Sequence, residues 1–206
     1  MTERKRFKRA EGTWAAQATY EEIRDFLISE YRATKHSIKQ RRAMGLSISR
    51  LTKRLAYLAV LLIQARNGCR VGEAVEALHK FISTGERAVY VRVEKKYKRD
   101  KKTKKTVPIT VMRTVTRPSL ISDDDLRLFA GVEVSKERVA WWASKRLGLN
   151  THAIRHAFIT YVVLKRGINP ATVAKMIEWS NLNMLLTYIS KKEAEEVLEG
   201  LEGLKF

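Results

Sequence analysis

The sequence predicts a mainly α-helical domain that carries one small antiparallel β-hairpin. Three observations lead to this fold class. The 206 residues are 45% hydrophobic, which is typical of a globular chain with one core. Apolar side chains recur at helical spacing over residues 15–81 and again after Ser119. Between these regions, residues 88–93 and 107–115 are rich in β-branched side chains, which indicates a pair of strands.

The first third of the chain predicts a basic arm and three helices. Residues 1–13 are basic and indicate a flexible arm. A first helix is expected over about 15–44 and should end at Gly45. The second, residues 48–67, has a nearly continuous apolar stretch and should therefore lie deep in the core. A third, shorter helix is expected over residues 71–81.

The middle of the chain predicts the hairpin. Residues 88–93 alternate apolar and polar side chains, and residues 107–115 are again β-branched. The stretch between them, residues 95–105, is polar and dense in lysine. We therefore expect two antiparallel strands joined by a long lysine-rich turn.

The remainder of the chain after Ser119 predicts helices. Ser122 is followed by three aspartates, a pattern typical of a helix N-terminus, where carboxylates interact favourably with the helix dipole. Gly148 and Gly167 are expected to end two of the later helices. Beyond the helix that begins at Ser122, helices are expected at about residues 135–147, 151–166, 169–178, 182–189 and 193–204.

Charge points to a polyanionic partner. The chain has 41 Lys and Arg against 22 Asp and Glu, a net charge of +19. Residues 92–117 carry +9 and residues 1–54 carry +8, and two separated basic blocks favour nucleic acid over a merely solvated face. A single cysteine excludes a disulfide framework, and there is neither a long apolar run nor a secretory signal. We expect an intracellular, cytoplasmic protein that does not bind membranes.

Five features follow one another in an order that helical propensity does not explain. An arginine, Arg70, stands at a helix start with Glu73 three residues later, and the lysine-rich hairpin follows. His152 and Arg155 share one face of an otherwise apolar helix. Trp179 comes next, and Tyr188 lies nine residues after it.

This ordered set resembles the tyrosine recombinase and phage-type integrase family. The family has an Arg in a G-x-R-x-x-E-like segment, a hairpin Lys, an H-x-x-R helix, a His or Trp, and a nucleophilic Tyr about nine residues later. The hairpin exit, residues 105–109, also resembles the family's K-x-x-V-P-L strand. The resemblance covers roughly residues 47–190 and implies the mainly α catalytic domain with a small antiparallel sheet that DNA breaking-rejoining enzymes share.

The resemblance also implies a division into domains. Residues 47–206 are expected to form the catalytic domain, and residues 1–46 a basic N-terminal arm and helix. Most members have a separate helical core-binding domain before the catalytic one, and residues 1–46 are too short for a full one. The chain is therefore either a piece of a longer protein or a compact member that uses residues 1–45 as a substitute.

The resemblance assigns roles to the arginines and the histidine. Arg70 and Arg155 would clamp the non-bridging oxygens of the phosphate under attack, a task suited to a planar, bidentate guanidinium. His152 would donate a hydrogen bond or move a proton near neutral pH. Glu73 is expected to orient Arg70 and to take no part in the chemistry.

The hairpin lysine would protonate the 5′ oxygen that leaves. In the family it stands at the end of the first hairpin strand, before the turn. If residues 99–102 form the turn, Lys98 has that position. Lys96 lies on the same face of the strand by two-residue alternation, and Lys101 is a third candidate if the turn shifts.

The last two features complete the implied mechanism. Trp179 would donate its indole N–H to a phosphate oxygen but could not act as an acid or base. Tyr188 would attack phosphorus and form a 3′-phosphotyrosine link that conserves the bond for religation. This scheme needs neither a metal nor another cofactor.

The function expected from the resemblance is site-specific DNA recombination by an integrase or transposase of a mobile element. Its partner would be double-stranded DNA, with self-association into a tetramer on that DNA. Two alternatives share the fold. One is DNA relaxation of the type IB topoisomerase kind, and the other is DNA binding without catalysis.

Overall fold

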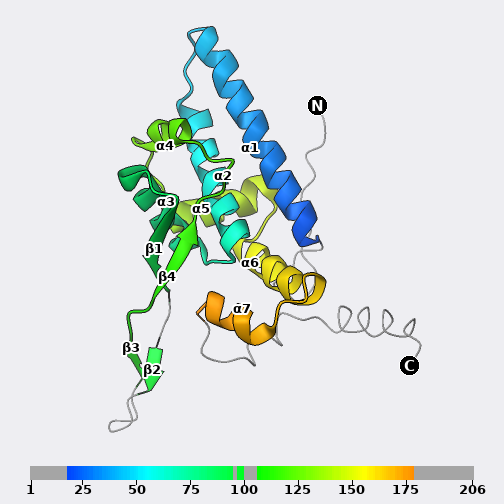
Figure 1. The fold of residues 1–206 in the computed structure, drawn as a ribbon. Helices are drawn as coiled ribbons and strands as arrows, with labels where there is room; N and C mark the ends of the chain where they lie inside the picture. Colours follow the sequence, from blue (N-terminus) through cyan, green and yellow to red (C-terminus); the bar gives the residue numbers. More distant parts are fainter. Residues whose placement is uncertain (1–17, 95–96, 100–105, 179–206) are drawn as a thin grey trace, which may run out of the picture.

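The computed structural model describes residues 18–94, 97–99 and 106–178 (Figure 1). Several sequence predictions lie outside these residues: the basic arm, the hairpin lysines Lys96 and Lys101, the helices expected at 182–189 and 193–204, and both Trp179 and Tyr188.

Two long helices form the spine of the fold. Helix α1, Tyr20–Ala43, begins with a capping box in which Thr19 and Glu22 exchange hydrogen bonds with each other's backbone. Helix α2, Ser49–Asn67, runs back beside it, and the predicted apolar stretch from Leu55 to Ile63 is buried throughout. The prediction that this helix lies deep in the core is confirmed.

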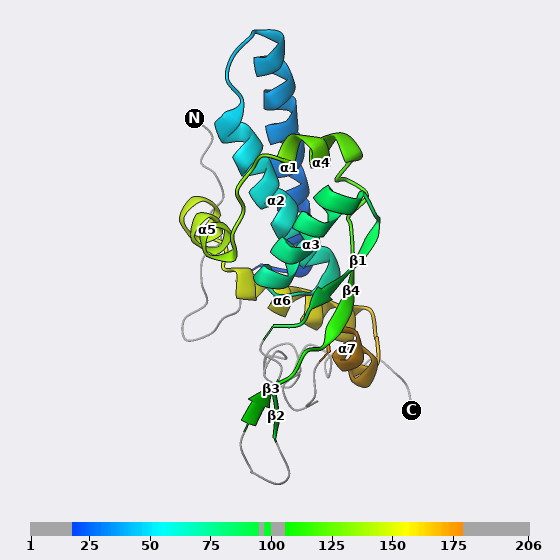
Figure 2. The same ribbon diagram turned by 90° about the vertical axis from the view of Figure 1, so that its left-hand side faces the viewer.

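Helix α3, Val71–Thr84, follows α2 after a short turn and supports the first sheet. Strand β1, Ala88–Arg92, pairs antiparallel with β4, Met112–Thr116. Two side chains of α3 fix β1: the Lys80 ammonium donates to the backbone O of Tyr90 (2.6 Å), and the Glu76 carboxylate accepts from the backbone N of Arg92 (3.1 Å). Side chains of α3 therefore hold the main chain of β1, and the helix lies beside the sheet (Figure 2).

The hairpin differs from its prediction in two respects, because residues 97–99 of the predicted basic connection form a strand and the second predicted strand is interrupted. Residues 107–115 do not form one strand, because β3, Thr106–Pro108, is separated from β4 by residues 109–111. Strand β3 pairs with β2, Tyr97–Arg99, in a second small antiparallel sheet. The ladder breaks at Glu94, whose main chain turns away from the strand to contact α3, as described below.

The helices after the hairpin pack against this spine. Helix α4, Asp123–Phe129, is capped by Ser122 as predicted. Two of the later helices change winding: α5, Lys136–Trp142, continues as the π-helix η1, Ala143–Leu147, and α6, Thr151–Thr160, as η2, Tyr161–Lys165. The last described helix is α7, Pro170–Met176.

Two clusters of apolar side chains hold the described part together. The larger one joins α1, α2, α3, both strands of the first sheet, α4, α5 and the start of α6. The smaller one joins α6, η2 and α7 through Phe158, Ile159, Val162, Val173, Ala174 and Ile177. Among the described helices, none combines the length and the apolar character that crossing a membrane requires.

Candidate active site

The candidate site is built on the C-terminal end of α2 and the turn that follows it. Asn67 fixes this end to β4: its side-chain oxygen accepts from the backbone N of Thr116 (3.0 Å), and its side-chain N donates to the backbone O of Thr116 (2.9 Å). Gly68 then turns the chain at φ +58°, in the left-handed region that favours glycine. A Cβ there would meet the ring of Phe158 at 2.2 Å, so the glycine also lets α6 approach α2 closely.

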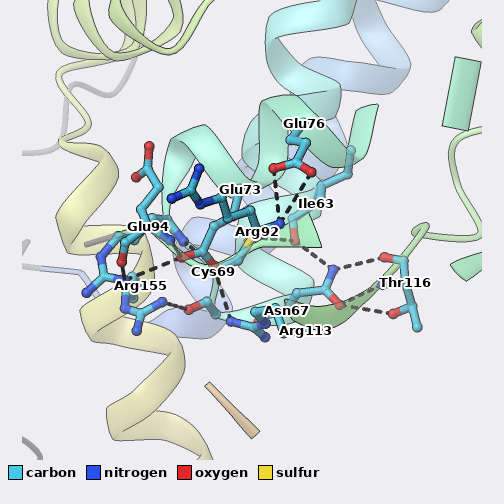
Figure 3. A network of polar contacts seen from close by, with 12 residues as sticks. Ile63, Asn67, Cys69, Glu73, Glu76, Arg92, Glu94, Arg113, Thr116 and Arg155 are labelled. Carbon is cyan, nitrogen blue, oxygen red and sulfur yellow. Dashed lines mark hydrogen bonds and ion pairs between the residues drawn. The ribbon is translucent and has the colours of Figure 1, made fainter. Parts of the chain in front are cut away.

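Glu73 in the first turn of α3 is the centre of a buried polar network (Figure 3). Its carboxylate accepts from the backbone N of Arg70 (3.3 Å) and pairs with the guanidinium of Arg70 (3.4 Å). The same carboxylate pairs with Arg113 from β4 (3.5 Å) and accepts from the backbone N of Glu94 (3.3 Å). One carboxylate is thus shared by two guanidinium groups, and the trio keeps a net positive charge.

Arg70 itself is held at the start of α3. Its Nη1 donates to the backbone O of Glu94 at 2.8 Å, besides the longer contact to Glu73. Only 19% of its side chain is exposed. These contacts agree with the prediction that Glu73 orients Arg70. The backbone of Glu94, two residues after β1, also holds the Arg70 guanidinium.

Arg155 reaches the same segment from α6. It is 2% exposed, and its Nη1 donates to the backbone O of Gly68 at 2.6 Å. Arg70 lies two residues further along that segment. The fold therefore brings together two arginines that are 85 positions apart in sequence, by docking α6 on the turn between α2 and α3.

Arg113 is a third arginine of this cluster, and the sequence analysis did not single it out. Its side chain is 4% exposed, and besides the contact to Glu73 its Nη2 donates to the backbone O of Asn67 at 2.8 Å. A signal was present, since Arg113 alternates with Val115 and so falls on the inward face of β4. A buried arginine on a strand indicates a polar network rather than a solvated edge.

Glu94 and Lys136 are two further charged residues at the site that the sequence analysis missed. The Glu94 carboxylate lies over the first turn of α3, where a Cβ on Gly72 would stand 2.1 Å from its oxygen. It pairs at 3.3 Å with Lys136, which begins α5. Gly72 has no left-handed backbone to explain it, so its role is to leave space for this carboxylate.

His152 is exposed in the first turn of α6 and borders a hollow of about 380 Å³. Asn150 caps the helix by accepting from the backbone N of His152 at 2.9 Å. The hollow is also lined by Val71 at the start of α3 and by Lys136. Three helix N-termini, a histidine and an ammonium group therefore border one open space, together with Glu137 of the first turn of α5. The positive ends of the helices favour an anion there.

The hairpin lysine is placed only in part. Lys98 lies in β2, where it pairs with Val107 of β3, so it is a strand residue as expected. Its rivals Lys96 and Lys101, together with Trp179 and Tyr188, lie outside the described residues.

Cys69 lies within the same turn but takes no part in an exposed site. It is fully buried, and burial raises the pKa of its thiol to about 12. Because the thiolate is the reactive form, this cysteine is inert in the folded protein. The nucleophile of the site must be sought elsewhere.

The comparisons with known proteins agree with this geometry. Residues 39–195 match the phage integrase family. "Putative integrase ORF241" of Acidianus two-tailed virus is 32% identical over 190 residues, which cover 92% of this chain and 69% of the viral protein. "Putative integrase V10" of Sputnik virophage is 28% identical over 164 residues, 71% of each chain. "Uncharacterized protein MJ0770" of Methanocaldococcus jannaschii is 25% identical over 224 residues, 96% of this chain and 92% of that protein.

The chain therefore belongs to the phage integrase family, whose match covers well over half of its length. At the level of the family it is a site-specific recombinase, an enzyme of the tyrosine recombinase kind, and membership implies that it binds DNA. The family resemblance inferred from the ordered motif and the predicted fold class are both confirmed.

Proposed function

We propose that this protein is the integrase or transposase of a mobile element and that it cuts and rejoins duplex DNA through a covalent 3′-phosphotyrosine. Tyr188 is the proposed nucleophile. The phenol of Tyr188 gives up its proton to solvent as its oxygen forms a bond to phosphorus, the bond from phosphorus to the 5′ oxygen breaks, and that oxygen takes up a proton from the general acid. Rejoining runs the same steps in reverse with a 5′ hydroxyl from the partner strand.

The observation that carries this proposal is the pair of arginines at the turn after α2. Arg155 donates to Gly68, and Arg70 is fixed by Glu73 and by the main chain of Glu94. Guanidinium groups held in advance by protein contacts can neutralise the phosphate oxygens without reorganising during the reaction. Arg113 also pairs with Glu73 and so helps to hold the carboxylate that orients Arg70.

The remaining roles follow from position and chemistry. His152 at the open N-terminus of α6 is proposed to donate to the phosphate or to move a proton. Lys98 is proposed as the acid for the leaving 5′ oxygen, with Lys96 and Lys101 as its alternatives. Trp179 is proposed to donate its indole N–H to a phosphate oxygen. No step requires a metal or a cofactor.

Recombination also implies an assembly. Strand exchange between two duplexes needs four active protomers, so we propose a tetramer that forms on DNA. The net charge of +19 opposes association of the protein alone, and DNA phosphates would screen it. The work would take place inside the cell, on a host or viral genome.

The decisive experiment traps the covalent intermediate. The protein is incubated with nicked suicide duplexes, from which cleavage releases a short fragment that cannot rejoin. The sequence around the nick is randomised, so that the pool includes the target site. We expect a protein–DNA adduct that survives denaturing electrophoresis, and peptide mapping should place the DNA on Tyr188. The trapped sequences would also give the target site.

The matched variants are Tyr188→Phe and Tyr90→Phe. Loss of the Tyr188 hydroxyl should abolish the adduct and leave DNA affinity nearly unchanged, because affinity comes from phosphate neutralisation elsewhere. Tyr90 is 68% exposed on β1, away from the cluster, and its variant should react normally. Adducts formed by Tyr188→Phe would assign the nucleophile to another residue. Relaxation of supercoiled DNA without exchange between duplexes would favour the topoisomerase alternative.

A further inference from the structure

The connection between α1 and α2 carries a second concentration of positive charge, far from the candidate active site. Between Glu30 and Glu73 the chain has ten Lys and Arg and no acidic residue. Helix α1 changes character along its length, since residues 20–30 hold four acids and one arginine while residues 31–43 hold five cations and no acid. The cations of the second half therefore exceed what the last helical turn needs to balance the dipole.

Four of these cations stand close to the connection between the helices, and we name them the basic tip: Lys39 and Arg42 near the end of α1, and Arg50 and Lys53 near the start of α2. All four are exposed, and none forms an ion pair with a described acidic residue. Neighbouring cations behave differently: Lys35 pairs with Asp125 at 2.8 Å, and Arg54 pairs with Glu30.

The start of α2 breaks the rules that normally stabilise a helix N-terminus. Its N-cap is Ile48, which offers no side-chain hydrogen bond, and its first turn has no acidic residue. Arg50 stands instead in the first turn, where a cation opposes the helix dipole. Such local conflicts with stability are expected at sites kept for function.

The connection itself is exposed and is held by hydrogen bonds to the end of α1. The backbone N of Leu46 donates to the backbone O of Arg41 at 2.9 Å, and the side chain of Arg41 donates to the backbone O of Ser47. Met44 and Leu46 are 63% and 46% exposed beside the cations. Apolar side chains among unpaired cations favour a partner over a purely solvated face.

We infer that the basic tip is a second DNA-binding surface, which holds the phosphate backbone of a duplex outside the cleavage point. Helix α2 spans about 28 Å between the basic tip and the turn at Gly68. The two surfaces lie at opposite ends of that helix (Figure 1), so the basic tip cannot contact the phosphate held by Arg70 and Arg155. The inference requires only that the chain binds DNA, and it is independent of the covalent chemistry proposed above.

The test compares two triple variants of equal net charge on a 40-base-pair duplex. One removes the tip cations, by Lys39→Ala, Arg42→Ala and Arg50→Ala. The other removes three cations that already have acidic partners, by Arg24→Ala, Arg127→Ala and Arg138→Ala. Affinity is measured over a range of salt concentrations, because each lost phosphate contact reduces the log–log slope by about 0.9.

We expect the tip variant to lower the slope by about 2 to 3 and the control variant to lower it by less than 1. The rate of adduct formation with saturating suicide duplex should be the same for the tip variant and the wild type. An unchanged slope, or equal losses in the two variants, would overturn the inference. If the tip variant lost binding to anionic vesicles but bound duplex DNA as the wild type does, the inference would be overturned in favour of a lipid surface.

A single change separates a binding role from a structural one. Arg50→Glu places an acid in the first turn of α2 and should raise Tm by about 1–3 °C while it weakens DNA binding. A lower Tm would show that Arg50 stabilises the fold, and the inference would fail. If the wild type formed no adduct but the tip variant still lost its slope, the inference would stand and the proposed chemistry would not.

Discussion

Helix α2 has arginines at both of its ends, and the two ends hold their charge in different ways. At the C-terminal end, Arg70, Arg113 and Arg155 are largely buried and bound to Glu73 or to main-chain oxygens. At the N-terminal end, the cations of the basic tip are exposed and lack acidic partners among the described residues. Buried, oriented cations suit catalysis, which needs fixed geometry, whereas exposed cations suit binding, which needs only charge and reach.

The strongest test of this difference removes one cation from each end. Arg155→Ala should lower the single-turnover rate of DNA cleavage by roughly 10²-fold or more, the effect of removing one preorganised donor. Lys39→Ala at the other end should leave that rate unchanged. Rates are followed on saturating suicide duplex, so that weaker binding does not enter. Equal rates for Arg155→Ala and the wild type would return Arg155 to a structural role.

Stability should differ between the ends as well, and two glycines provide a matched pair. Gly68 and Gly45 both have left-handed backbones, with φ of +58° and +66°. A Cβ at Gly68 meets Phe158 at 2.2 Å, whereas a Cβ at Gly45 meets nothing within 4 Å. Gly45→Ala should destabilise by about 1 kcal/mol from backbone strain, and Gly68→Ala by about 2–4 kcal/mol, because overpacking is added.

Denaturant unfolding with both variants measures this pair. The slope against denaturant should stay the same, so that the shift in midpoint reports stability. Similar losses in the two variants would mean that α6 can move away from the turn without penalty. The site would then be less rigid than its contacts indicate.

The third test concerns function without stability at the buried end. Gly72→Ala puts a Cβ 2.1 Å from the Glu94 carboxylate, which must move together with its contact to Lys136. Alanine stabilises a helix by about 0.5–1 kcal/mol relative to glycine, which should offset the cost of moving the Glu94 carboxylate. The free energy of unfolding should therefore change little. Cleavage should fall by about tenfold or more, because Arg70 is bound to the main chain of Glu94 and small displacements are costly in catalysis.

Gly131→Ala is the control for this variant, since a Cβ at Gly131 meets nothing within 4 Å. It should cleave DNA at the wild-type rate. If Gly72→Ala did so as well, the position of Glu94 would be irrelevant to the reaction.

The smallest expected effect is a pH dependence at the contact between Lys35 of α1 and Asp125 of α4. Burial acts to raise the pKa of Asp125, but hydrogen bonds from Lys35 and Ser122 outweigh it, and the pKa lies below its usual range. A lowered folded-state pKa stabilises the protein above the unfolded value, and this contribution disappears as pH falls through the folded value. Asp125→Asn should therefore be less stable than the wild type at pH 7, and the gap should narrow below about pH 4.

Thermal unfolding across this pH range measures the gap. A constant difference between Asp125→Asn and the wild type would show that the carboxylate charge does not contribute.

Much of the fold could be predicted from local pattern. The apolar stretch of α2, the cap at Ser122 and the ends at Gly45 and Gly68 were all visible, because helix burial and helix termination depend on neighbouring residues. The strand break at residues 109–111 was not visible. It depends on Glu94, which leaves the strand ladder to contact α3.

The candidate site shows the same division more sharply. The family was identified from the sequence alone by the ordered set of Arg70, the hairpin lysine, the pair His152 and Arg155, Trp179 and Tyr188, since those residue types are set by chemistry at fixed points of one chain. Arg113, Glu94 and Lys136 carry no such spacing. They join the site only because β4, the root of the hairpin and α5 pack around the first turn of α3.

The sequence by itself thus determined the helices of the described residues, the family and the residue types at the site, because each follows from periodicity or from an ordered motif. Only the tertiary structure decided which cations are paired. Glu73 is shared by two arginines that lie 43 positions apart, while the cations around residues 39–53 meet no described acid. The number of charged residues is known from the sequence. Whether a cation has an acidic partner depends on which segments of the chain pack close together in the folded protein.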